Sequence, residues 1–242
     1  MLLLYKFMLS YNELVKKLKE IKNMSYVVTH RKGDTGIGKT LEDLLGIREN
    51  NIPGPNGEMI ELKSTRKDTK SMLTLFTKSP LPRGANSILL KKFGYKTAKS
   101  KGKKELHTTI SATSFNTLRG EIGFKIDIKD DRIELVSKDF EVLSYWDKKT
   151  LKESFEKKFP KFMYVKAETK GKGSNEEFWF NEVWVLSGFD FRDFLKLLKE
   201  GTILVDIRIG QYSDGRPHDH GTAFRISPDK LNLCFKHRKR VL

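Results

Sequence analysis

Glu61 and Lys63 place a carboxylate and an ammonium two positions apart, at the end of the run Asn56-Gly57-Glu58-Met59-Ile60-Glu61-Leu62-Lys63. Residues 58–64 alternate as a β-strand does, so both side chains are expected on one face, about 6–7 Å apart along the chain. A carboxylate there can hold Mg²⁺, and an ammonium beside it can face a phosphate. Hydrolysis of a phosphodiester needs a metal that makes hydroxide and a cation for the charge that develops. The spacing therefore predicts a phosphate-cutting centre.

The same spacing also fits a surface ion pair on an edge strand, because E-x-K alone is a weak signal. Asp127-Ile128-Lys129 matches the D-x-K version of the pattern equally well. This second copy precedes an ordinary hairpin turn at Asp130-Asp131 and lacks the proline-rich approach that precedes Glu61. We therefore interpret the second copy as structural.

A competing motif lies upstream, where residues 33–40 match the phosphate-binding P-loop pattern G-x-x-x-x-G-K-[ST]. In that interpretation backbone amides cradle phosphates, Lys39 reaches the terminal phosphate and Thr40 binds magnesium. Three features of the chain argue against it. The helix predicted after Thr40 lasts under two turns before Gly46, and the chain does not alternate strand and helix as a doubly wound sheet should. The segment Ile203-Leu204-Val205-Asp206 looks like the Walker B motif that accompanies a P-loop, but Asp206 lacks a neighbouring carboxylate to position water.

The elements that must position these residues are a mixture of helices and strands. A capping box at residues 10–13 predicts a helix, and a shorter helix is expected at 39–45. Asp190 is expected to cap another helix, which Gly201 ends. The expected strand pairs are 121–128 with 132–136, 162–168 with 177–186, and 202–209 with 221–226. The predicted fold class is mixed α and β with much antiparallel pairing. A chain of 242 residues with 38% hydrophobic residues can bury one large core.

The charge balance points to a polyanionic partner. The chain has 47 basic and 31 acidic residues, a net charge of +16. Nucleic acid is the first candidate, an anionic membrane the second, and a merely basic soluble protein the remaining alternative. Residues 91–104 hold seven lysines and no acid, which predicts a mobile basic loop that either contacts phosphates or is simply solvated. The basic tail at 236–240 is expected to add phosphate contacts.

The compartment is predicted from cysteine usage and from the start of the chain. Cys234 is the single cysteine, which rules out an internal disulfide and suits a reducing cytoplasm. The apolar residues 1–7 are too short to span a bilayer and lack the features of a signal peptide. We expect a soluble cytoplasmic protein without a membrane partner.

A longer pattern carries a family resemblance. Residues 30–46, followed by Glu61-Leu62-Lys63-Ser64, resemble the MvaI/BcnI restriction endonucleases, which are relatives of the mismatch-repair nickase MutH in the PD-(D/E)XK nuclease superfamily. The resemblance extends past residues 74–77 and resumes at 206–208 and 218–225. It also accounts for the P-loop match, because in this family the glycine-rich turn leads into the helix that carries Glu42.

The resemblance implies a fold and a division of the chain into a catalytic part and a recognition part. It implies a PD-(D/E)XK nuclease core with a mixed sheet, flanking helices and a DNA-recognition lobe. We expect one nuclease chain over residues 1–242, with the catalytic part at about 10–130 and the recognition part at about 160–242.

The resemblance also assigns roles within the centre. Glu61 looks like the metal-binding carboxylate, Lys63 like the catalytic lysine, and Glu42 like a glutamate that supports the site from behind. The implied Mg²⁺ site comprises residue 56, Glu61 and Leu62. Glu42 is alternatively a simple solvent-facing helix acid.

Asn56 departs from the family pattern, which has a metal-binding aspartate at this position. Asparagine offers a hard cation a neutral carbonyl oxygen and no negative charge, so metal affinity and activation of bound water should both suffer. Three explanations are open: a substitution made to trap an uncut complex, a naturally inactive homologue, or a relocated acid. Glu58 is the nearest candidate for the last, although it points to the face opposite Glu61. We favour a disabled form of an otherwise ordinary nuclease.

Asp206 and Arg208 lie two apart on a predicted strand and share a face. An arginine can pair with guanine O6 and N7, and an aspartate can accept from cytosine N4, so the pair suits G·C recognition in the major groove. An ordinary ion pair is the alternative. By resemblance, His218 and Arg225 contact further bases, with His220 as a neighbour, and the family reads short pseudo-palindromic sites of the CC-x-GG kind.

The function that the resemblance implies is a Mg²⁺-dependent type II restriction endonuclease acting on double-stranded DNA. It would act as a monomer that nicks one strand and then the other. A cognate DNA methyltransferase would protect the host genome without physical association. The alternatives are a catalytically silent, sequence-specific DNA-binding homologue and, more distantly, a P-loop ATPase using residues 33–40.

Overall fold

The chain forms two compact units, each assembled from separate stretches of sequence. The computed structural model describes residues 9–47, 60–98, 100–159, 161–219 and 221–242. The first unit comprises Met1–Lys70, Glu156–Asp190 and Phe235–Leu242, and the second comprises Ser71–Phe155 and Phe191–Cys234. The units therefore interleave along the chain, whereas the sequence suggested two consecutive parts.

The first unit is built around a mixed sheet. Its strands run in the order β1-β11-β10-β2, with β15 pairing β11 in addition. β10 pairs β2 in parallel, and the other pairings are antiparallel. Its elements are α1 (Tyr11–Asn23), β1 (Val27–Val28), α2 (Gly36–Leu45), β2 (Ile60–Arg66), β10 (Lys161–Lys170), η2 (Gly173–Asn175), β11 (Glu177–Ser187) and β15 (His237–Arg240).

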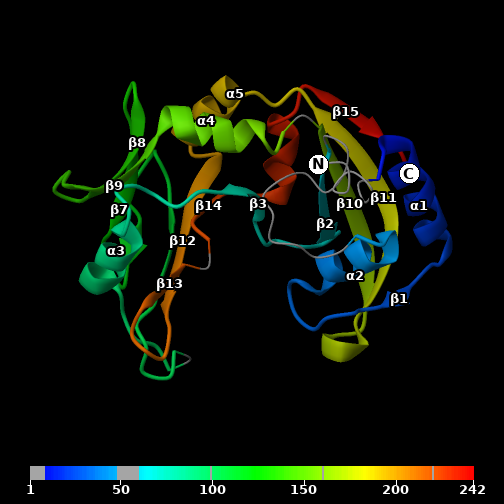
Figure 1. The fold of residues 1–242 in the computed structure, drawn as a ribbon, viewed down its shortest axis with the longest axis horizontal. Helices are drawn as coiled ribbons and strands as arrows, with labels where there is room; N and C mark the ends of the chain where they lie inside the picture. Colours follow the sequence, from blue (N-terminus) through cyan, green and yellow to red (C-terminus); the bar gives the residue numbers. More distant parts are fainter. Residues whose placement is uncertain (1–8, 48–59, 99, 160, 220) are drawn as a thin grey trace, which may run out of the picture. The chain divides into compact units, whose positions relative to one another are not determined.

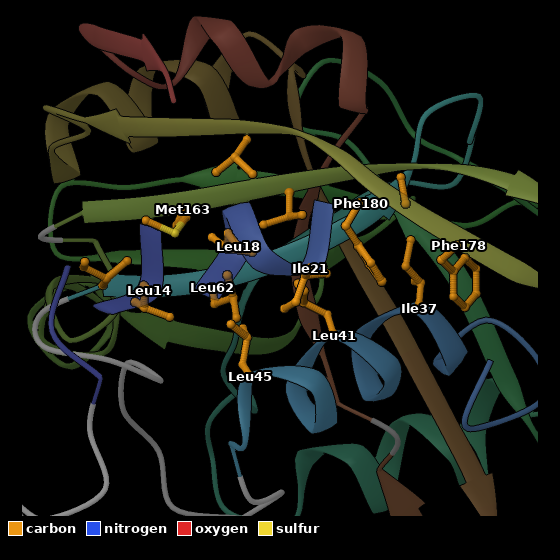
Figure 2. Close-up of a cluster of buried hydrophobic side chains, with 14 residues drawn as sticks. Leu14, Leu18, Ile21, Ile37, Leu41, Leu45, Leu62, Met163, Phe178 and Phe180 are labelled. Atoms are coloured by element: carbon orange, nitrogen blue, oxygen red, sulfur yellow. The ribbon is translucent and has the colours of Figure 1, made fainter. Parts of the chain in front are cut away.

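Helices α1 and α2 cover one face of this sheet (Figure 1). The predicted capping box begins α1: the Ser10 hydroxyl accepts from the Glu13 amide at 3.3 Å, and Glu13 accepts from the Ser10 amide at 2.8 Å. Gly46 ends α2 in the left-handed conformation, at φ 74°. Figure 2 shows the side chains of both helices converging on Leu62, Met163 and Phe180 of the sheet. Burial of this face fixes which way β2 is turned.

The orientation of β2 follows from that core. Ile60 and Leu62 pack under the helices, so Glu61 and Lys63 project from the opposite face. In the parallel register Glu61 stands beside Phe162, and Lys63 stands beside Tyr164. The strand begins at Ile60, and the predicted positions 58 and 59 lie outside the described residues.

The second unit holds a separate five-stranded antiparallel sheet in the order β13-β12-β14-β3, with β4 pairing β12. A three-stranded sheet β7-β8-β9 and the pair β5-β6 complete it. Its elements are β3 (Leu73–Thr77), α3 (Ala85–Phe93), β4 (Leu106–Ile110), β5 (Thr117–Leu118), β6 (Glu121–Ile122), β7 (Phe124–Ile128), β8 (Arg132–Ser137), β9 (Val142–Asp147), α4 (Lys148–Glu156), α5 (Phe191–Lys199), β12 (Ile203–Gln211), β13 (Pro217–Asp219), β14 (Ala223–Ile226) and η3 (Pro228–Leu233).

An aromatic cluster fills one side of the five-stranded sheet. Phe76 and Phe224 stack with ring centroids 4.9 Å apart, and Phe194 and Trp146 contact Phe224 at 5.2 and 5.6 Å. Ring pairs of this kind add to the stability that their buried area gives. Polar side chains of β12 and β14 are consequently left on the other side of the sheet.

Most predicted elements are confirmed, including the mixed α and β class and the antiparallel pairing of 202–209 with 221–226. One expectation was wrong. The lysine-rich segment 91–104 is not a loop throughout, because it begins in the last turn of α3 and is closed by an antiparallel bridge between Tyr95 and Glu105. The basic tail forms strand β15, paired with β11. In the part of the chain that is described, no helix is long and apolar enough to cross a membrane.

Candidate active site and recognition face

Glu61 is a buried carboxylate held between two lysines. Its side chain is 3% exposed. Glu61 Oε1 lies 3.1 Å from Lys63 Nζ, and Glu61 Oε2 lies 3.1 Å from Lys158 Nζ. A buried carboxylate is costly unless it is paired. The first contact is the one that strand alternation predicted, and the second is not visible in the sequence pattern.

Lys158 reaches Glu61 from 97 positions away. It lies between α4 and β10, and the next residue, Phe159, fixes this connection by packing among aromatic rings. The Phe159 ring lies 5.3 Å from Phe189, 6.2 Å from Phe162 and 6.4 Å from Phe235. Lys158 carries no motif in the sequence. Only the parallel pairing of β10 with β2 brings it to the carboxylate.

Tyr164 stands beside Lys63 on the neighbouring strand. Its hydroxyl is buried. Burial raises the pKa of Tyr164 to about 12, so the phenol is neutral near neutral pH. On the side of β10, an uncharged phenol therefore borders the centre.

Two further residues, Glu42 and Asn56, were expected in the centre. Glu42 is half-buried on α2, and the buried side chains of that helix contact the Ile60 and Leu62 face of β2. Asn56, expected at the position of the metal-binding aspartate, lies outside the described residues.

The donor chemistry at Glu61 fits a hard divalent cation, because Mg²⁺ binds carboxylate and carbonyl oxygens. Both carboxylate oxygens, however, already face an ammonium at 3.1 Å. Each oxygen has a second lone pair, so the two ammonium groups use only part of what the carboxylate can accept. Within the described ranges, no group of three or more histidine, cysteine, aspartate or glutamate side chains could hold a metal ion.

The glycine-rich segment is occupied by internal contacts. The Thr40 hydroxyl is fully buried, donates to the Gly36 carbonyl at 2.8 Å and accepts from the His30 amide at 2.9 Å. Lys39 Nζ contacts Asp43 Oδ1 at 2.6 Å. Neither group is therefore presented to a nucleotide, which removes the main support for a P-loop ATPase.

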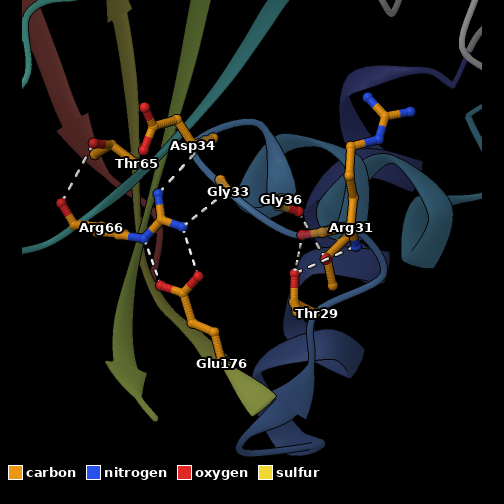
Figure 3. Close-up of polar contacts among 9 residues, drawn as sticks. Thr29, Arg31, Gly33, Asp34, Gly36, Thr65, Arg66 and Glu176 are labelled. Atoms are coloured by element: carbon orange, nitrogen blue, oxygen red, sulfur yellow. Dashed lines mark hydrogen bonds and ion pairs between the residues drawn. The ribbon is translucent and has the colours of Figure 1, made fainter. Parts of the chain in front are cut away.

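Arg66 of β2 holds the same segment against the sheet. Its guanidinium makes two contacts to Glu176, at 2.6 and 2.7 Å, and donates to the carbonyls of Gly33 and Asp34 at 3.3 and 3.5 Å (Figure 3). A Cβ at Gly36 would lie 2.2 Å from the Arg31 carbonyl oxygen. Close packing at the start of α2 therefore explains the glycine at position 36. The match to the P-loop pattern follows from this packing.

Asp206 is the centre of the polar face of the second unit. It is 1% exposed. Its Oδ2 contacts Arg208 Nε at 2.6 Å and Arg225 Nη1 at 3.0 Å, and its Oδ1 accepts from the Thr109 hydroxyl at 3.0 Å. Both oxygens are thus engaged in this arrangement. In this arrangement Asp206 orients two arginines, and its expected contact with a cytosine amino group stays a prediction.

The two arginines differ in exposure. The Arg208 side chain is 45% exposed, whereas the Arg225 side chain is 21% exposed. Burial lowers the pKa of Arg225, and Asp206 opposes that effect. Arg208 is therefore the more accessible of the two guanidiniums.

The adjoining strand β13 carries His218, whose ring lies 4.5 Å from that of Tyr212. His220 lies outside the described residues. Asp219, which sequence reasoning missed, accepts from Ser79 at 2.9 Å and from Asn86 at 2.7 Å. These contacts tie β13 to α3 and hold His218 beside the polar face.

Comparisons with known proteins give the family and the fold. A solved structure described as the restriction endonuclease MvaI–cognate DNA substrate complex is 34% identical, over 96% of this chain and 98% of that chain, with a TM-score of 0.84. MvaI in the absence of DNA is also 34% identical, over 96% and 97% of the two chains, with a TM-score of 0.57. A search of curated proteins found no match. The family model of the MvaI/BcnI restriction endonucleases matches residues 15–235. The chain therefore belongs to the MvaI/BcnI restriction endonuclease family and has a restriction-endonuclease-like fold.

Proposed function

We propose that this protein is a type II restriction endonuclease that hydrolyses phosphodiester bonds of double-stranded DNA. The observation that carries the proposal is the buried Glu61 carboxylate with the Lys63 ammonium beside it on one face of β2. Family membership gives the reaction class, and the net charge of +16 supports a polyanionic substrate.

The centre would work with Mg²⁺, held by Glu61 together with residue 56 and Leu62. When bound, the metal would supply hydroxide and polarise the phosphoryl oxygen. Lys63 would place its ammonium against the scissile phosphate, where it stabilises the charge that develops in the transition state. The buried Tyr164 stands beside Lys63 on the neighbouring strand. Glu42 would support β2 from the side of α2.

DNA recognition would come from the polar face of the second unit. Arg208 and Arg225, oriented by Asp206, would donate to guanine edges, and His218 with His220 would contact further bases. The proposed site is short, pseudo-palindromic and rich in G·C, of the CC-x-GG kind. We further propose a monomer that nicks the strands in turn, in cells where a methyltransferase modifies the same site.

Asn56 favours one alternative, a catalytically silent homologue that binds the same DNA without cutting it. The residue contributes no charge where the family has an aspartate, and the described carboxylate is already paired with two ammonium groups. The lower negative charge should weaken metal binding.

Plasmid digestion with Mg²⁺ separates the two functions. We expect Asn56→Asp to release discrete fragments or nicks, and the unchanged protein to cut slowly or not at all. Lys63→Met in the Asn56→Asp protein controls for a contaminating nuclease. Absence of cutting by Asn56→Asp would refute the nuclease proposal, whereas equal cutting by both proteins would show that Asn56 is not disabling.

A further inference from the structure

We propose that a lysine-bearing turn of the second unit binds the phosphate backbone of the DNA that Arg208 reads. This lysine turn comprises residues 96–98 and 100–104, in which Lys96, Lys101 and Lys103 are exposed and no acidic residue occurs. The sequence pattern left open whether these lysines contact phosphates or are only solvated. The inference rests on the proposed DNA-recognition face and adds to it the place where the backbone of the duplex is held.

The lysine turn has a defined backbone conformation. The Lys103 amide donates to the Ser100 carbonyl at 3.0 Å. Between them, Lys101 and Gly102 are both left-handed, with φ angles of 49° and 82°. These features define a type I′ turn, whose corners favour glycine, asparagine and aspartate. A lysine in this conformation costs stability, because its Cβ crowds the following carbonyl oxygen. A residue that is held in a costly conformation at an exposed corner is a candidate for a functional role.

The lysine turn is attached to the strands that carry the recognition face. The Lys104 amide donates to Gln211 Oε1 at 3.0 Å, and Figure 1 shows the turn beside the hairpin of β12 and β13. After the turn the chain enters β4, where His107 stands opposite Arg208. A strand advances about 3.3 Å per residue, so Gln211 at the end of β12 lies about 10 Å from Arg208. Since the major groove is about 12 Å wide, lysines at this end of the sheet can reach the DNA backbone while Arg208 reaches a base edge.

The charges near the lysine turn leave this end of the sheet positive. Asp214, between β12 and β13, pairs with Arg216 at 2.7 Å. Hydrogen bonds from Arg216 lower the pKa of Asp214, and the charge of Lys103 contributes to the same effect, which places Lys103 near the hairpin. The described lysines of the turn and Arg216 outnumber the two acids, Asp214 and Glu105. An exposed positive surface beside a DNA-reading face fits phosphate groups.

Salt-dependent DNA binding, measured without divalent metal, tests the inference. The probes are a short duplex with a CC-x-GG centre and a shuffled duplex of the same composition. Replacement of both Lys101 and Lys103 by glutamine should weaken the binding of both duplexes alike. The loss should be about tenfold larger at about 50 mM than at about 200 mM salt, because each lost phosphate contact lowers the salt slope by about 0.9.

Two matched variants control for charge and position. Replacement of Lys101 and Lys103 by arginine keeps both charges and should retain the affinity and the salt slope of the unchanged protein. Replacement of Lys16 and Lys19 by glutamine removes two exposed charges from α1, which covers the sheet face opposite Glu61, and should leave the slope unchanged.

Lys101→Asn separates DNA binding from folding. Asparagine is favoured at this corner, so the variant should melt about 1–3 °C above the unchanged protein and still bind DNA more weakly. An unchanged salt slope in the glutamine variant, or a loss confined to the CC-x-GG duplex, would overturn the inference. If the unchanged protein binds neither duplex, the proposed recognition face fails together with the inference, and cutting by Asn56→Asp is scored separately.

Discussion

Glu61 in the first unit and Asp206 in the second are both buried carboxylates held by two cationic side chains, but the cations differ in kind. Glu61 meets one lysine ammonium at each oxygen. Asp206 meets two guanidiniums at one oxygen and a threonine hydroxyl at the other. An ammonium is a compact charge on a flexible stem, whereas a guanidinium is a planar fork with fixed donors.

The difference fits two kinds of task. In the proposed function Lys63 turns toward a phosphate, and the flexible stem of a lysine suits that task. Arginine forks held by a fixed carboxylate keep their donors in one plane, which suits the bidentate pattern of guanine. Glu61 is thus paired with two flexible ammonium groups, whereas Asp206 holds two planar guanidiniums.

The largest expected effect is on the cleavage rate and comes from substitution of Glu61 in the first unit. Glu61→Gln in the Asn56→Asp protein should lower the cleavage rate by about 10²–10³-fold or more, because the carboxylate that would hold the metal is lost. The affinity for cognate DNA should stay within a few-fold, since the second unit is untouched. Single-turnover cleavage and equilibrium DNA binding measure the two quantities. Equal losses of both would argue that Glu61 is only a structural ion pair.

The second prediction concerns the recognition side. Asp206→Asn should weaken discrimination between cognate and altered sites by roughly 1–3 kcal/mol per base pair read, because the two arginines lose their common acceptor. It should also lower stability, since two guanidiniums then lack a buried counter-charge. Competition binding with altered sites and chemical denaturation measure these effects.

Arg208→Lys controls for the stability loss. The substitution keeps the charge and removes the planar fork, so discrimination should fall while the melting temperature stays close to that of the unchanged protein. Retained discrimination in both variants would assign DNA reading to other residues.

The smallest effect is expected at the second copy of the acid-x-lysine pattern. Lys129 contacts Asp127 at 2.7 Å on a surface hairpin, and this contact raises the pKa of Lys129. Exposed pairs of this kind contribute little to stability. Lys129→Met should therefore leave both plasmid cleavage by the Asn56→Asp protein and the melting temperature unchanged. A clear loss of cleavage would show that the motif at Glu61 had been chosen wrongly between the two copies.

Local pattern was sufficient for much of the fold. The capping box at Ser10, the Gly46 stop of α2 and the hairpin around Asp130-Asp131 follow from backbone geometry within a few residues. The common face of Glu61 and Lys63 follows from the two-residue repeat of a strand. Such features depend on neighbours in the sequence, so the sequence alone determined them.

Tertiary structure decided what surrounds each acid. Lys158 reaches Glu61 because β10 pairs in parallel with β2, and Arg225 and Thr109 reach Asp206 because β14 and β4 flank β12. It also decided that Thr40 is buried and cannot serve a nucleotide. These contacts join residues far apart in the chain, and their choice depends on which apolar faces are buried together. No short sequence pattern specifies which apolar faces are buried together. The packing of the two sheets decides it.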